Sequence, residues 1–502
     1  MKNYILLLLT SFSSIFINAQ EITDGLRLAQ TNINGTARFQ SMSGAFGSLG
    51  GDFSAININP AGSAIFNNNQ WSISLSNNIL KNSTNYIGTK TESDKNSVTV
   101  NQAAAIFVFD NYDQKSNWKK FALSVNYENT GNFNNDVFSA GTNNNSLGNY
   151  FTSYANANQS GIQLGFIENN NYDELNFADQ QAWLGYEGYV INPEFPSDPS
   201  NTNYFNGVRS GGKYYQENTF ESRGYNGKLN FNIAGQYKDW LSVGMNLNSH
   251  FTDYRQSTSF FESNNNPTTI DPMVKEIRFD NEIHTFGSGF SLQFGAIAKI
   301  NKQFRVGLTY DSPTWYELND ELTQSLVTVR TVNVGVLPRD VVDPKVINIY
   351  EPYQLKTPSK WTASGSYIFA KKGLISLDVA TKDFSDISFG PNNQFTRVKD
   401  QVNILLDRTF EYRLGGEYRI KNFSLRGGYR FEQSPYKNKK TIGDLYGIST
   451  GLGYNWGETK LDVSYAYSKR NMQNQFFSQG LTDFSSTTAI NSNVTFTLVF
   501  EL

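Results

Sequence analysis

The clearest feature of the chain is an alternation of apolar and polar residues that returns many times. In the last stretch, residues 490–502, the apolar positions are Val494, Phe496, Leu498, Phe500 and Leu502, with mostly polar residues between them. Because successive side chains of a strand point to opposite faces, this period of two predicts a strand with one apolar face. An apolar face that runs to the chain terminus is also typical of the last strand of an outer-membrane barrel.

The same period predicts fourteen strands, an even number, as in bacterial single-chain barrels. They cover residues 71–80, 97–109, 120–130, 222–237, 240–254, 284–300, 303–312, 355–369, 374–383, 408–420, 423–434, 442–456, 459–470 and 490–502. Many of them exceed the roughly 9–11 residues that cross a bilayer, so their outer ends should project from the membrane.

The connections between these strands alternate in length. The short ones are residues 238–239, 301–302, 370–373, 421–422 and 457–458, with 110–119 somewhat longer, and the long ones include 131–221, 255–283 and 313–354. Barrels of the outer membrane have short periplasmic turns and long extracellular loops. We therefore predict an all-β protein, a 14-stranded antiparallel transmembrane β-barrel over residues 70–502 with these long extracellular loops. Loop 131–221 contains enough apolar residues to fold over the barrel mouth, as a lid or as a surface ornament.

Tryptophan positions and composition agree with a barrel in the cell outer membrane. Trp71, Trp118, Trp240 and Trp456 all fall at the predicted periplasmic rim, where an aromatic girdle is expected. Aromatic residues reach 15% while charged residues are 17%, which fits a wall that alternates lipid-facing and lumen-facing side chains. A soluble secreted protein would have no reason to sort loop lengths or tryptophans in this way.

The first residues, "MKNYILLLLTSFSSIFINAQ", predict a signal peptide over residues 1–19. Lys2 supplies the positive start, an apolar run follows, and the cleavage site would lie after Ala19. The alternative, an uncleaved anchor helix, is too short and too rich in serine. After it, residues 20–69 include "GGDFSAININPAGSAIF", which suits neither a lipid-facing strand nor a stable helix.

Several kinds of chemistry have no support in the sequence. The chain has no cysteine, so it has no lipoprotein anchor, disulfide or thiolate ligand. Its 42 basic and 45 acidic residues give no basic excess for nucleic acid. His250 and His284 are distant and stand in no catalytic or metal-binding constellation. We predict no enzyme activity, no cofactor and no metal site.

Four blocks in order resemble the FadL family of outer-membrane transporters for long-chain fatty acids and other hydrophobic compounds. The first, "GTARFQSMSGAFGSLGGDFSAININPAG", ends in the family's Asn-Pro-Ala. The others are "RVGLTYDSPTWYEL", "LKTPSKWTASGSYIF" and the late hairpin "EYRLGGEYRIKNFSLRGGYRFEQSP". They cover most of the mature chain, and the glycine-rich first block resembles the branch common in Bacteroidota.

The resemblance implies that residues 20–69 form a hatch inside the barrel lumen, either an inert stopper or a movable gate. Its candidate residues are Gly44, Gly50 and Gly51, which permit tight turns, and Asn59, Pro60 and Ala61, where proline restricts the backbone. The resemblance also implies a lateral exit at a kink in the third strand. Asn129, Thr130 and Gly131 are the local candidates for that break.

Alternation places a set of charged side chains of the late hairpin in the lumen. If residues 421–422 form a two-residue turn, Glu417 faces Arg426 and Arg413 faces Arg430. Arg413 or Arg430 would then bind a ligand carboxylate through charge-assisted hydrogen bonds. In the other interpretation, these residues and the neighbouring Glu411 and Glu432 form an internally satisfied charge ladder.

The predicted function is passive diffusion of long-chain fatty acids or other hydrophobic small molecules through a hatch-plugged barrel surrounded by outer-membrane lipid. The alternative is a non-transporting barrel subunit of an outer-membrane secretion or assembly complex, with loops 131–221 and 313–354 as docking surfaces. A lumen path with a gap in the wall favours transport, whereas a sealed wall with an exposed apolar loop patch favours docking.

Overall fold

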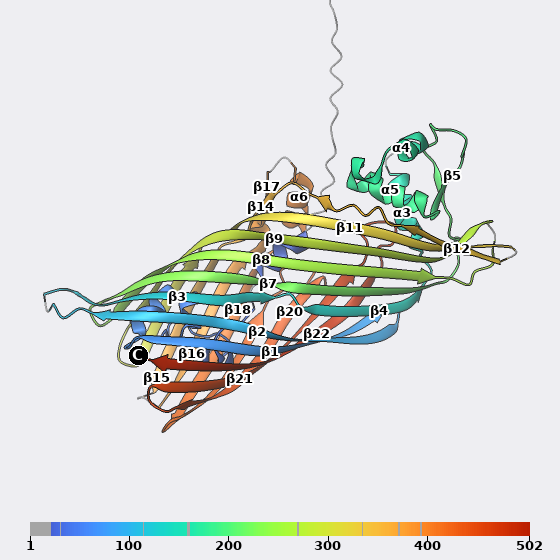
Figure 1. Cartoon of the computed structure of the whole chain (residues 1–502). Helices are drawn as coiled ribbons and strands as arrows, with labels where there is room; N and C mark the ends of the chain where they lie inside the picture. The colour runs from blue at the N-terminus through green and yellow to red at the C-terminus, as the bar shows by residue number, and fades with distance from the viewer. Residues whose placement is uncertain are drawn as a thin grey trace, which may run out of the picture.

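Antiparallel strands form a closed barrel in the computed structural model (Figure 1). The structure describes residues 22–502 except 31, 114, 158–160, 269–270, 334, 370–371 and 392–393. The predicted signal peptide therefore lies outside the described residues. The first strand, β1 (Gln70–Tyr86), pairs with the last, β22 (Phe484–Glu501), in the antiparallel register Trp71↔Phe500, which closes the ring. The wall has fourteen positions, which confirms the predicted fold class.

Some of the wall positions consist of one strand and others of two consecutive segments. After β1 come β2 (Thr89–Asp110), β3 (Trp118–Asn132) with β4 (Asn135–Asn143), β7 (Tyr214–Tyr237), β8 (Leu241–Ser263), β9 (Met273–Lys299), β10 (Phe304–Asp311) with β11 (Trp315–Val332), β15 (Lys360–Phe369) with β14 (Tyr353–Lys356), β16 (Gly373–Asp383) with β17 (Ser388–Gly390), β18 (Arg408–Ile420), β19 (Phe423–Glu432), β20 (Ile442–Asn455), β21 (Thr459–Gln475) and β22.

The strands run well beyond the predicted boundaries at the end with the long connections, which we term the outer end. Much of the predicted loop sequence is in fact strand: β9 begins at Met273 and β11 continues its ladder against β9 up to Thr331. β12 (Gly335–Val342) and β13 (Asn348–Ile349) lie in predicted loop 313–354 as well. The outward face there is polar because the ladder continues outside the lipid, and the inward face of β11 mixes leucines with Asp320 and Gln324, so no regular apolar period marks the strand.

Lipid-facing positions carry the apolar half of the alternation. Exposed apolar side chains occur on strand after strand, including Ile73, Phe107, Leu123, Phe231, Leu247, Phe294, Leu308, Ile375, Leu414, Leu425 and Phe496. The four predicted rim tryptophans are all exposed, and Trp71 stacks on Phe500 across the seam between β1 and β22. In the described residues, no helix is long and apolar enough to cross a bilayer.

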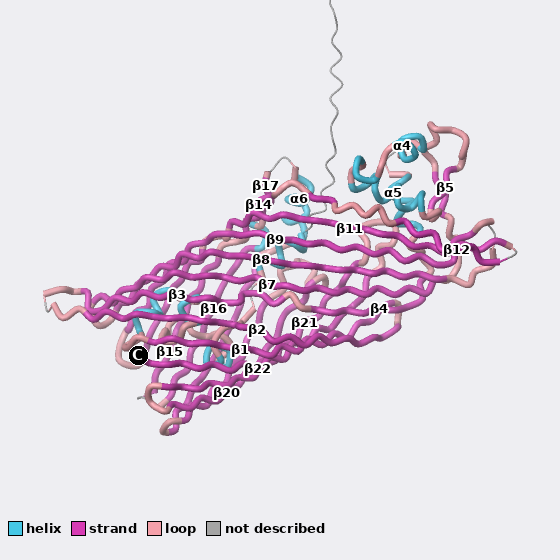
Figure 2. The backbone as a smooth tube through the Cα atoms, viewed as in Figure 1, coloured by secondary structure: helices cyan, strands magenta, loops and turns pink. Residues whose placement is uncertain are grey.

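The N-terminal segment, residues 22–69, occupies the lumen (Figure 2). It contains α1 (Ile22–Ala29), α2 (Ala37–Ser41) and two 3-10 helices, η1 (Ser54–Asn57) and η2 (Pro60–Ile65). α1 packs near the outer end with α6 (Thr396–Leu405) in a cluster that includes Leu26 and Val398. At the other end, Phe53, Ile56 and Phe66 pack against Ile106 and Ala122 of the wall. The segment therefore descends through the barrel from the outer end to the short-turn end.

A small helical unit closes over the outer end, beside β12 in Figure 1. It consists of α3 (Gly148–Ala155), α4 (Leu164–Asn169), η3 (Tyr172–Glu174), α5 (Phe177–Glu187) and a hairpin of β5 (Ile191–Pro193) and β6 (Tyr204–Asn206). A further 3-10 turn, η4 (Phe384–Asp386), lies outside this unit, between β16 and β17. The helical unit shares one apolar cluster with Phe260 of β8, Phe279 of β9 and Leu326 of β11. Loop 131–221 is thus a packed part of the fold.

Candidate functional site

The backbone of the N-terminal segment lies directly against the barrel wall at a row of glycines. A Cβ at Gly307 would stand 2.2 Å from the carbonyl oxygen of Gly47, and one at Gly244 would stand 2.5 Å from the carbonyl carbon of Pro60. At Gly415 and Gly428 a Cβ would likewise meet the Met42 backbone, and at Gly295 and Gly451 it would meet the side chains of Asn59 and Ser41. These wall glycines belong to six strands, and only hydrogen fits in the space between wall and segment.

Buried charges fix the lower half of the segment. Glu417 of β18 accepts hydrogen bonds from Arg38 Nε at 2.9 Å, Arg426 Nε at 2.7 Å and Arg419 Nε at 2.8 Å. Arg426 NH1 also reaches Asp462 Oδ1 at 2.5 Å. The Glu417 side chain is only 1% exposed. One carboxylate therefore joins the N-terminal segment to two strands, and each guanidinium of this group has an acidic partner.

Two further anchors are polar contacts to backbone. Asp378 of β16 accepts hydrogen bonds from the amide groups of Phe46 and Gly47, each at 3.0 Å to Oδ2. Asn59 Nδ2 donates to the carbonyl oxygen of Gly47 at 2.7 Å and to that of Ala296 in β9 at 3.0 Å. Irregular backbone in a barrel lumen needs such partners, because no ladder satisfies it.

The predicted hatch residues lie at turns and at a helix start within the segment. Gly44, Gly50 and Gly51 have φ values of +76°, +62° and +66°, in the left-handed region that favours glycine. Pro60 begins η2, and the Asn59 side chain caps that helix by accepting a hydrogen bond from the Ala61 amide at 3.1 Å. The sequence patterns did not identify the wall residues that contact this part of the segment.

The predicted kink residues coincide with an irregularity in the wall. The ladder between β3 and β7 shifts register between Asn129 and Gly131. On its other side, β3 pairs with β2 only as far as Glu128↔Gln102, while residues 89–101 of β2 continue to pair with β1. In the described residues, no ladder joins this part of β2 to β4, and the wall has a gap in its hydrogen bonding there.

Side chains bridge the gap in place of the ladder. Asn132 Nδ2 donates to Ser97 Oγ at 2.9 Å, Ser93 Oγ donates to the carbonyl oxygen of Asp136 at 2.8 Å, and Lys95 Nζ pairs with the Asp136 carboxylate at 2.8 Å. Side-chain bridges leave strands free to separate at lower free-energy cost than a continuous ladder, because each bond has a solvated alternative.

The N-terminal segment supplies hydrogen bonds to the same irregularity. Asn34 Nδ2 donates to the carbonyl oxygen of Asn129 at 2.8 Å, and the amide of Asn32 donates to that of Thr130 at 3.3 Å. These carbonyls lie just beyond the end of the β2–β3 ladder. The segment therefore supplies hydrogen bonds that a paired strand would otherwise supply. Its position is linked to that of the register shift between Asn129 and Gly131.

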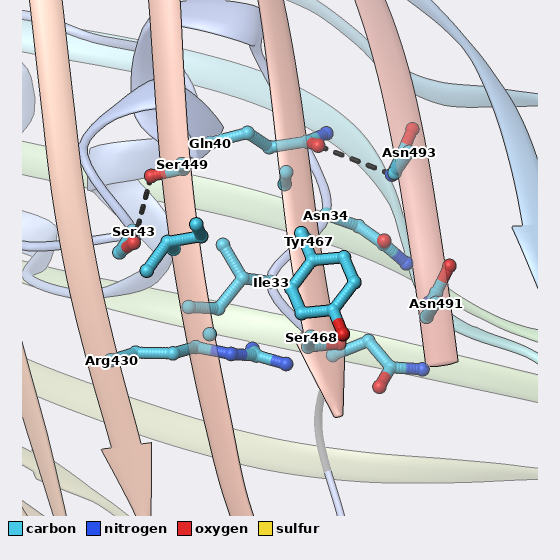
Figure 3. A pocket seen from close by; sticks show the side chains of 14 residues that line it. Ile33, Asn34, Gln40, Ser43, Arg430, Ser449, Tyr467, Ser468, Asn491 and Asn493 are labelled. Atoms are coloured by element: carbon cyan, nitrogen blue, oxygen red, sulfur yellow. Dashed lines mark hydrogen bonds between the residues drawn. The ribbon is translucent and has the colours of Figure 1, made fainter. Parts of the chain in front are cut away.

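A polar chamber lies beside the gap. It consists of two adjoining cavities of about 40 Å³ each, which share Asn32, Asn34 and Asn491. Figure 3 shows the first cavity, where Arg430, Ser468 and the asparagines surround the same space. The second cavity is lined by Asn78, Leu80, Lys95, Ser97, Asn132 and Asn134 together with the shared residues, so it reaches the gap between β2 and β4.

The late hairpin has the predicted register. Glu417 pairs with Arg426 and Arg413 pairs with Arg430 across β18 and β19. Arg413 is in contact with Glu411 at 2.5 Å, and Arg430 NH1 lies 3.3 Å from Glu432. Arg430 lines the chamber, whereas Arg413 is not among its lining residues. Both arginines therefore contact a neighbouring carboxylate, as in a charge ladder, and Arg430 also lines the chamber.

The outer mouth is sealed by aromatic residues from opposite sides of the ring. Phe476 and Phe477, between β21 and β22, pack on Phe260 of β8 with ring centroids 5.8 and 5.0 Å apart. Beneath this contact, Glu262 of β8 accepts hydrogen bonds from the Leu147 amide and from Gln216 Nε2, each at 2.7 Å. We term these contacts of Phe260, Phe476, Phe477 and Glu262 the outer seal.

The outer seal, which lies beyond the lipid, should weaken as pH rises. Burial raises the pKa of Glu262 to about 7, and hydrogen bonds from Ser146, Leu147 and Gln216 offset only part of that effect. Because the folded state binds the proton more tightly than the unfolded state, the stability contribution falls between roughly pH 4.5 and 7, by on the order of 3 kcal/mol. The protection factors of the α3 amides, which correct for the intrinsic pH dependence of exchange, should be lower at pH 8 than at pH 5, and Glu262→Gln should remove this difference. Glu217→Gln, at a half-buried site on the opposite face of β7 from Gln216, should retain it; equal pH dependence in all three proteins would contradict the assignment.

Sequence reasoning missed the residues that join segment and wall. Arg38, Asp378 and Asp462 come from separate parts of the chain, and only the lumen-facing alternation of Asp378 and Asp462 gave any signal. The asparagine lining of the chamber also comes from distant strands. In the part of the chain that the structure describes, no group of three or more His, Cys, Asp or Glu side chains has the arrangement of a metal site.

Comparison with known proteins places the fold. The family described as "Outer membrane protein transport protein (OMPP1/FadL/TodX)" matches residues 216–498, more than half of the chain. A Pseudomonas aeruginosa FadL homologue superimposes with a TM-score of 0.55 at 11% identity, over 94% of this chain and 99% of that chain. The P. putida toluene transporter TodX gives a TM-score of 0.50 at 10% identity, over 94% and 99%. Curated protein sequences give no match. The chain belongs to the OMPP1/FadL/TodX family of outer-membrane proteins, whose members are passive transport channels and not enzymes.

Proposed function

We propose that this protein carries hydrophobic or amphipathic small molecules, long-chain fatty acids among them, by passive diffusion through the gap between β2 and β4. The observation that carries the proposal is the end of the β2–β3 ladder at Glu128, beside a chamber that reaches the gap. Elsewhere in the described wall, each of the fourteen positions has a ladder to both of its neighbours, which leaves this gap as the proposed route from lumen to lipid.

The position of the gap supports exchange with the outer leaflet. Outward-facing Val98 and Val100 of β2 are 75% and 43% exposed, whereas the next outward positions toward the outer end are Asn96 and Asp94. The apolar band therefore ends near Val98, and the lower part of the gap opens at that level. A molecule in the chamber could extend its apolar part into lipid there while its polar part stays among asparagines.

The N-terminal segment would act as a hatch, and the contacts at its tip favour a movable gate over an inert stopper. Asn34 and Asn32 bond the carbonyl oxygens of Asn129 and Thr130 at the edge of the gap. A shift of Asn32 and Asn34 would break their hydrogen bonds to β3 at residues 129–130. In the same way, a change in this part of β3 would free Asn32 and Asn34. The lower half, held by Glu417 and Asp378, would remain in place and keep the lumen closed to ions.

Closing the gap covalently should stop transport. In a chain without native cysteine, the Ser97→Cys/Asn132→Cys double variant can form a disulfide at the site where the two side chains now share a hydrogen bond. We expect uptake of a labelled fatty acid by a Gram-negative host that lacks its own transporter to fall about tenfold or more when the pair is oxidised, since the lateral route is then shut. Uptake should return after reduction.

A matched pair on an intact ladder serves as the control. Ser76 of β1 and Thr495 of β22 also meet in the lumen through a side-chain hydrogen bond, but their strands are continuously paired. Ser76→Cys/Thr495→Cys should transport equally in both redox states. Unchanged uptake by the oxidised Ser97–Asn132 lock would rule out the lateral route.

A second candidate function, a non-transporting subunit of an outer-membrane complex, is favoured by one observation. β12 pairs only with β11 among the described strands, and Val336 and Val341 on it are 73% and 65% exposed. An open strand edge with apolar side chains is suited to protein docking. Purification in mild detergent separates the two functions: a solitary barrel with bound amphiphile supports transport, and a stoichiometric large partner supports docking.

A further inference from the structure

An ion pair spans the gap between β2 and β4. Lys95 Nζ of β2 donates a hydrogen bond to Asp136 Oδ2 of β4 at 2.8 Å, and the two side chains are 23% and 28% exposed. Among the described residues that line the second cavity, Lys95 is the only charged one. An ion pair between partly solvated groups adds little net stability, because water is an alternative partner for both charges. Lys95 can therefore exchange Asp136 for another carboxylate.

The ammonium group of Lys95 has capacity for that second carboxylate. It has three N–H donors, and among the described residues only Asp136 accepts a hydrogen bond from it. Asp136 Oδ1 is buried and has no hydrogen-bond partner in the described part of the chain, so parting of the two strands would let water reach it. The exchange can thus proceed without leaving either charge unpaired and buried.

Lys95 lies at the depth where the outward face of the wall changes from apolar to polar. On β2, the outward side chain of Val98 is 75% exposed, and the next two outward residues toward the outer end are Asn96 and Asp94. On the neighbouring β1, Lys81 pairs with Asp94 and marks the same depth. An anionic amphiphile in a bilayer keeps its charged group at this interface, because moving an ion into hydrocarbon is costly. Lys95 is therefore level with the head group of such a molecule.

The gap is least restrained on the membrane side of Lys95. Between Lys95 and the end of the β2–β3 ladder, one side-chain hydrogen bond among the described residues joins the two sides, from Asn132 Nδ2 to Ser97 Oγ at 2.9 Å. On the outer side of Lys95, the hydroxyl groups of Ser93 and Thr91 both donate to backbone carbonyl groups of β4. An alkyl chain would thus pass where few bonds hold the strands, with its head group beside Lys95.

We propose that Lys95 selects anionic amphiphiles at the lateral exit: when the gap opens, the carboxylate of the ligand takes the place of Asp136. This inference rests on the proposed function and names the residue that distinguishes a fatty acid from an uncharged compound with the same chain. The enclosed space beside Lys95, about 40 Å³, has room for a few water molecules, so the site is complete only when the strands part. A ligand that bonds Lys95 only in the open state shifts the gap toward opening.

Dodecanoate and dodecanol share an alkyl chain and differ in the charged group. Uptake of each labelled compound is measured in a Gram-negative host that lacks its own transporter, above the uptake of the same host without the barrel, and is normalised to the amount of folded barrel. The unmodified protein should favour dodecanoate. Lys95→Met should lower the ratio of dodecanoate to dodecanol uptake about tenfold, since a charge-assisted hydrogen bond is lost. Lys95→Arg should retain most of the ratio.

Asp136→Asn separates selection from closure of the gap. It breaks the same ion pair but leaves Lys95 charged and without a competing carboxylate, so the uptake ratio should rise about threefold. Lys460→Met is the matched control: Lys460 forms an ion pair of similar exposure with Glu501, but between the continuously paired strands β21 and β22. This variant should leave the ratio unchanged.

The outcomes distinguish this inference from the proposed function. Equal increases in the uptake of both compounds by Lys95→Met and Asp136→Asn would show that the ion pair only closes the gap, which overturns the inference and leaves the lateral route standing. A ratio that Lys95→Met does not change would have the same meaning. Unchanged uptake of both compounds by the oxidised Ser97–Asn132 lock would overturn the lateral route and this inference together.

Discussion

Gly307→Val should displace the hatch and turn the barrel into an open pore. A Cβ at this position would stand 2.2 Å from the carbonyl oxygen of Gly47, and backbone cannot yield as a flexible side chain can. Valine is favoured in strands, so the wall itself should still form. The clash should therefore displace the hatch, because β10 is held by ladders to strands on both sides.

The expected effect is large because the lumen is wide. Barrels of eight strands are filled by their own side chains, whereas those of sixteen to eighteen strands hold an aqueous channel, and a ring of fourteen falls near the second group. We expect about a tenfold rise in conductance in planar bilayers and a similar gain in cell sensitivity to a large hydrophilic antibiotic. A hatch that is an inert part of a solid core would instead unfold the whole barrel.

A neighbouring glycine provides the control. Gly365 of β15 is the cross-strand partner of Val306 in β10, and open space surrounds the position where its Cβ would stand. Gly365→Val should leave both conductance and antibiotic sensitivity unchanged. If the two valine variants behave alike, the close approach at Gly307 does not hold the hatch in place.

Glu417→Gln should loosen the lower hatch even though the barrel remains closed. The substitution leaves Arg38, Arg426 and Arg419 with only Asp462 among their observed acidic partners. Removing one partner of a buried ion pair typically costs about 3–5 kcal/mol, because an uncompensated charge stays buried. Proteolysis of folded protein in detergent should then cut the hatch near Arg38 well ahead of the barrel, and the free energy of unfolding should fall by a similar amount.

Arg419→Gln tests whether the buried position matters. Arg419 contacts the same carboxylate but its side chain is 51% exposed, so its loss should change stability by no more than about 1 kcal/mol. Equal protease resistance of Glu417→Gln and the unmodified protein would show that Asp378 and the wall glycines hold the hatch without this ion pair.

The strands of the wall can be predicted from sequence because each one is marked by a pattern among neighbouring residues. Alternation within about ten residues marks each strand, and a two-residue turn at residues 421–422 is enough to set the register of Glu417 against Arg426. The bulge at Asn129–Gly131 is also marked by glycine within a strand. Outside the lipid the outward face is no longer apolar, so the pattern predicts loop for residues 273–283 of β9 and for all of β11, which are strand.

The contents of the lumen are not predictable in the same way. Arg38 meets Glu417 across 379 positions of sequence, and Asn34 reaches Asn129 across 95. Such contacts depend on how the closed ring folds around the hatch, which no local pattern records. The glycines of the wall can be seen in the sequence, but the part of the hatch that packs against each of them cannot. The chamber arises only when asparagines from β1, β3, β22 and the hatch are brought to one place.

The contacts of the hatch also order the assembly of the barrel. The Ala37 amide donates to Thr497 Oγ1 of the last strand, and Gln40 accepts from Thr495 and Asn493. The first segment of the chain thus gains these partners only when the final one arrives, and β22 completes the seam with β1 at the same time. The hatch also contacts β16 and β18 through Asp378 and Glu417, so only its contacts with Asn493, Thr495 and Thr497 depend on the same strand that closes the ring.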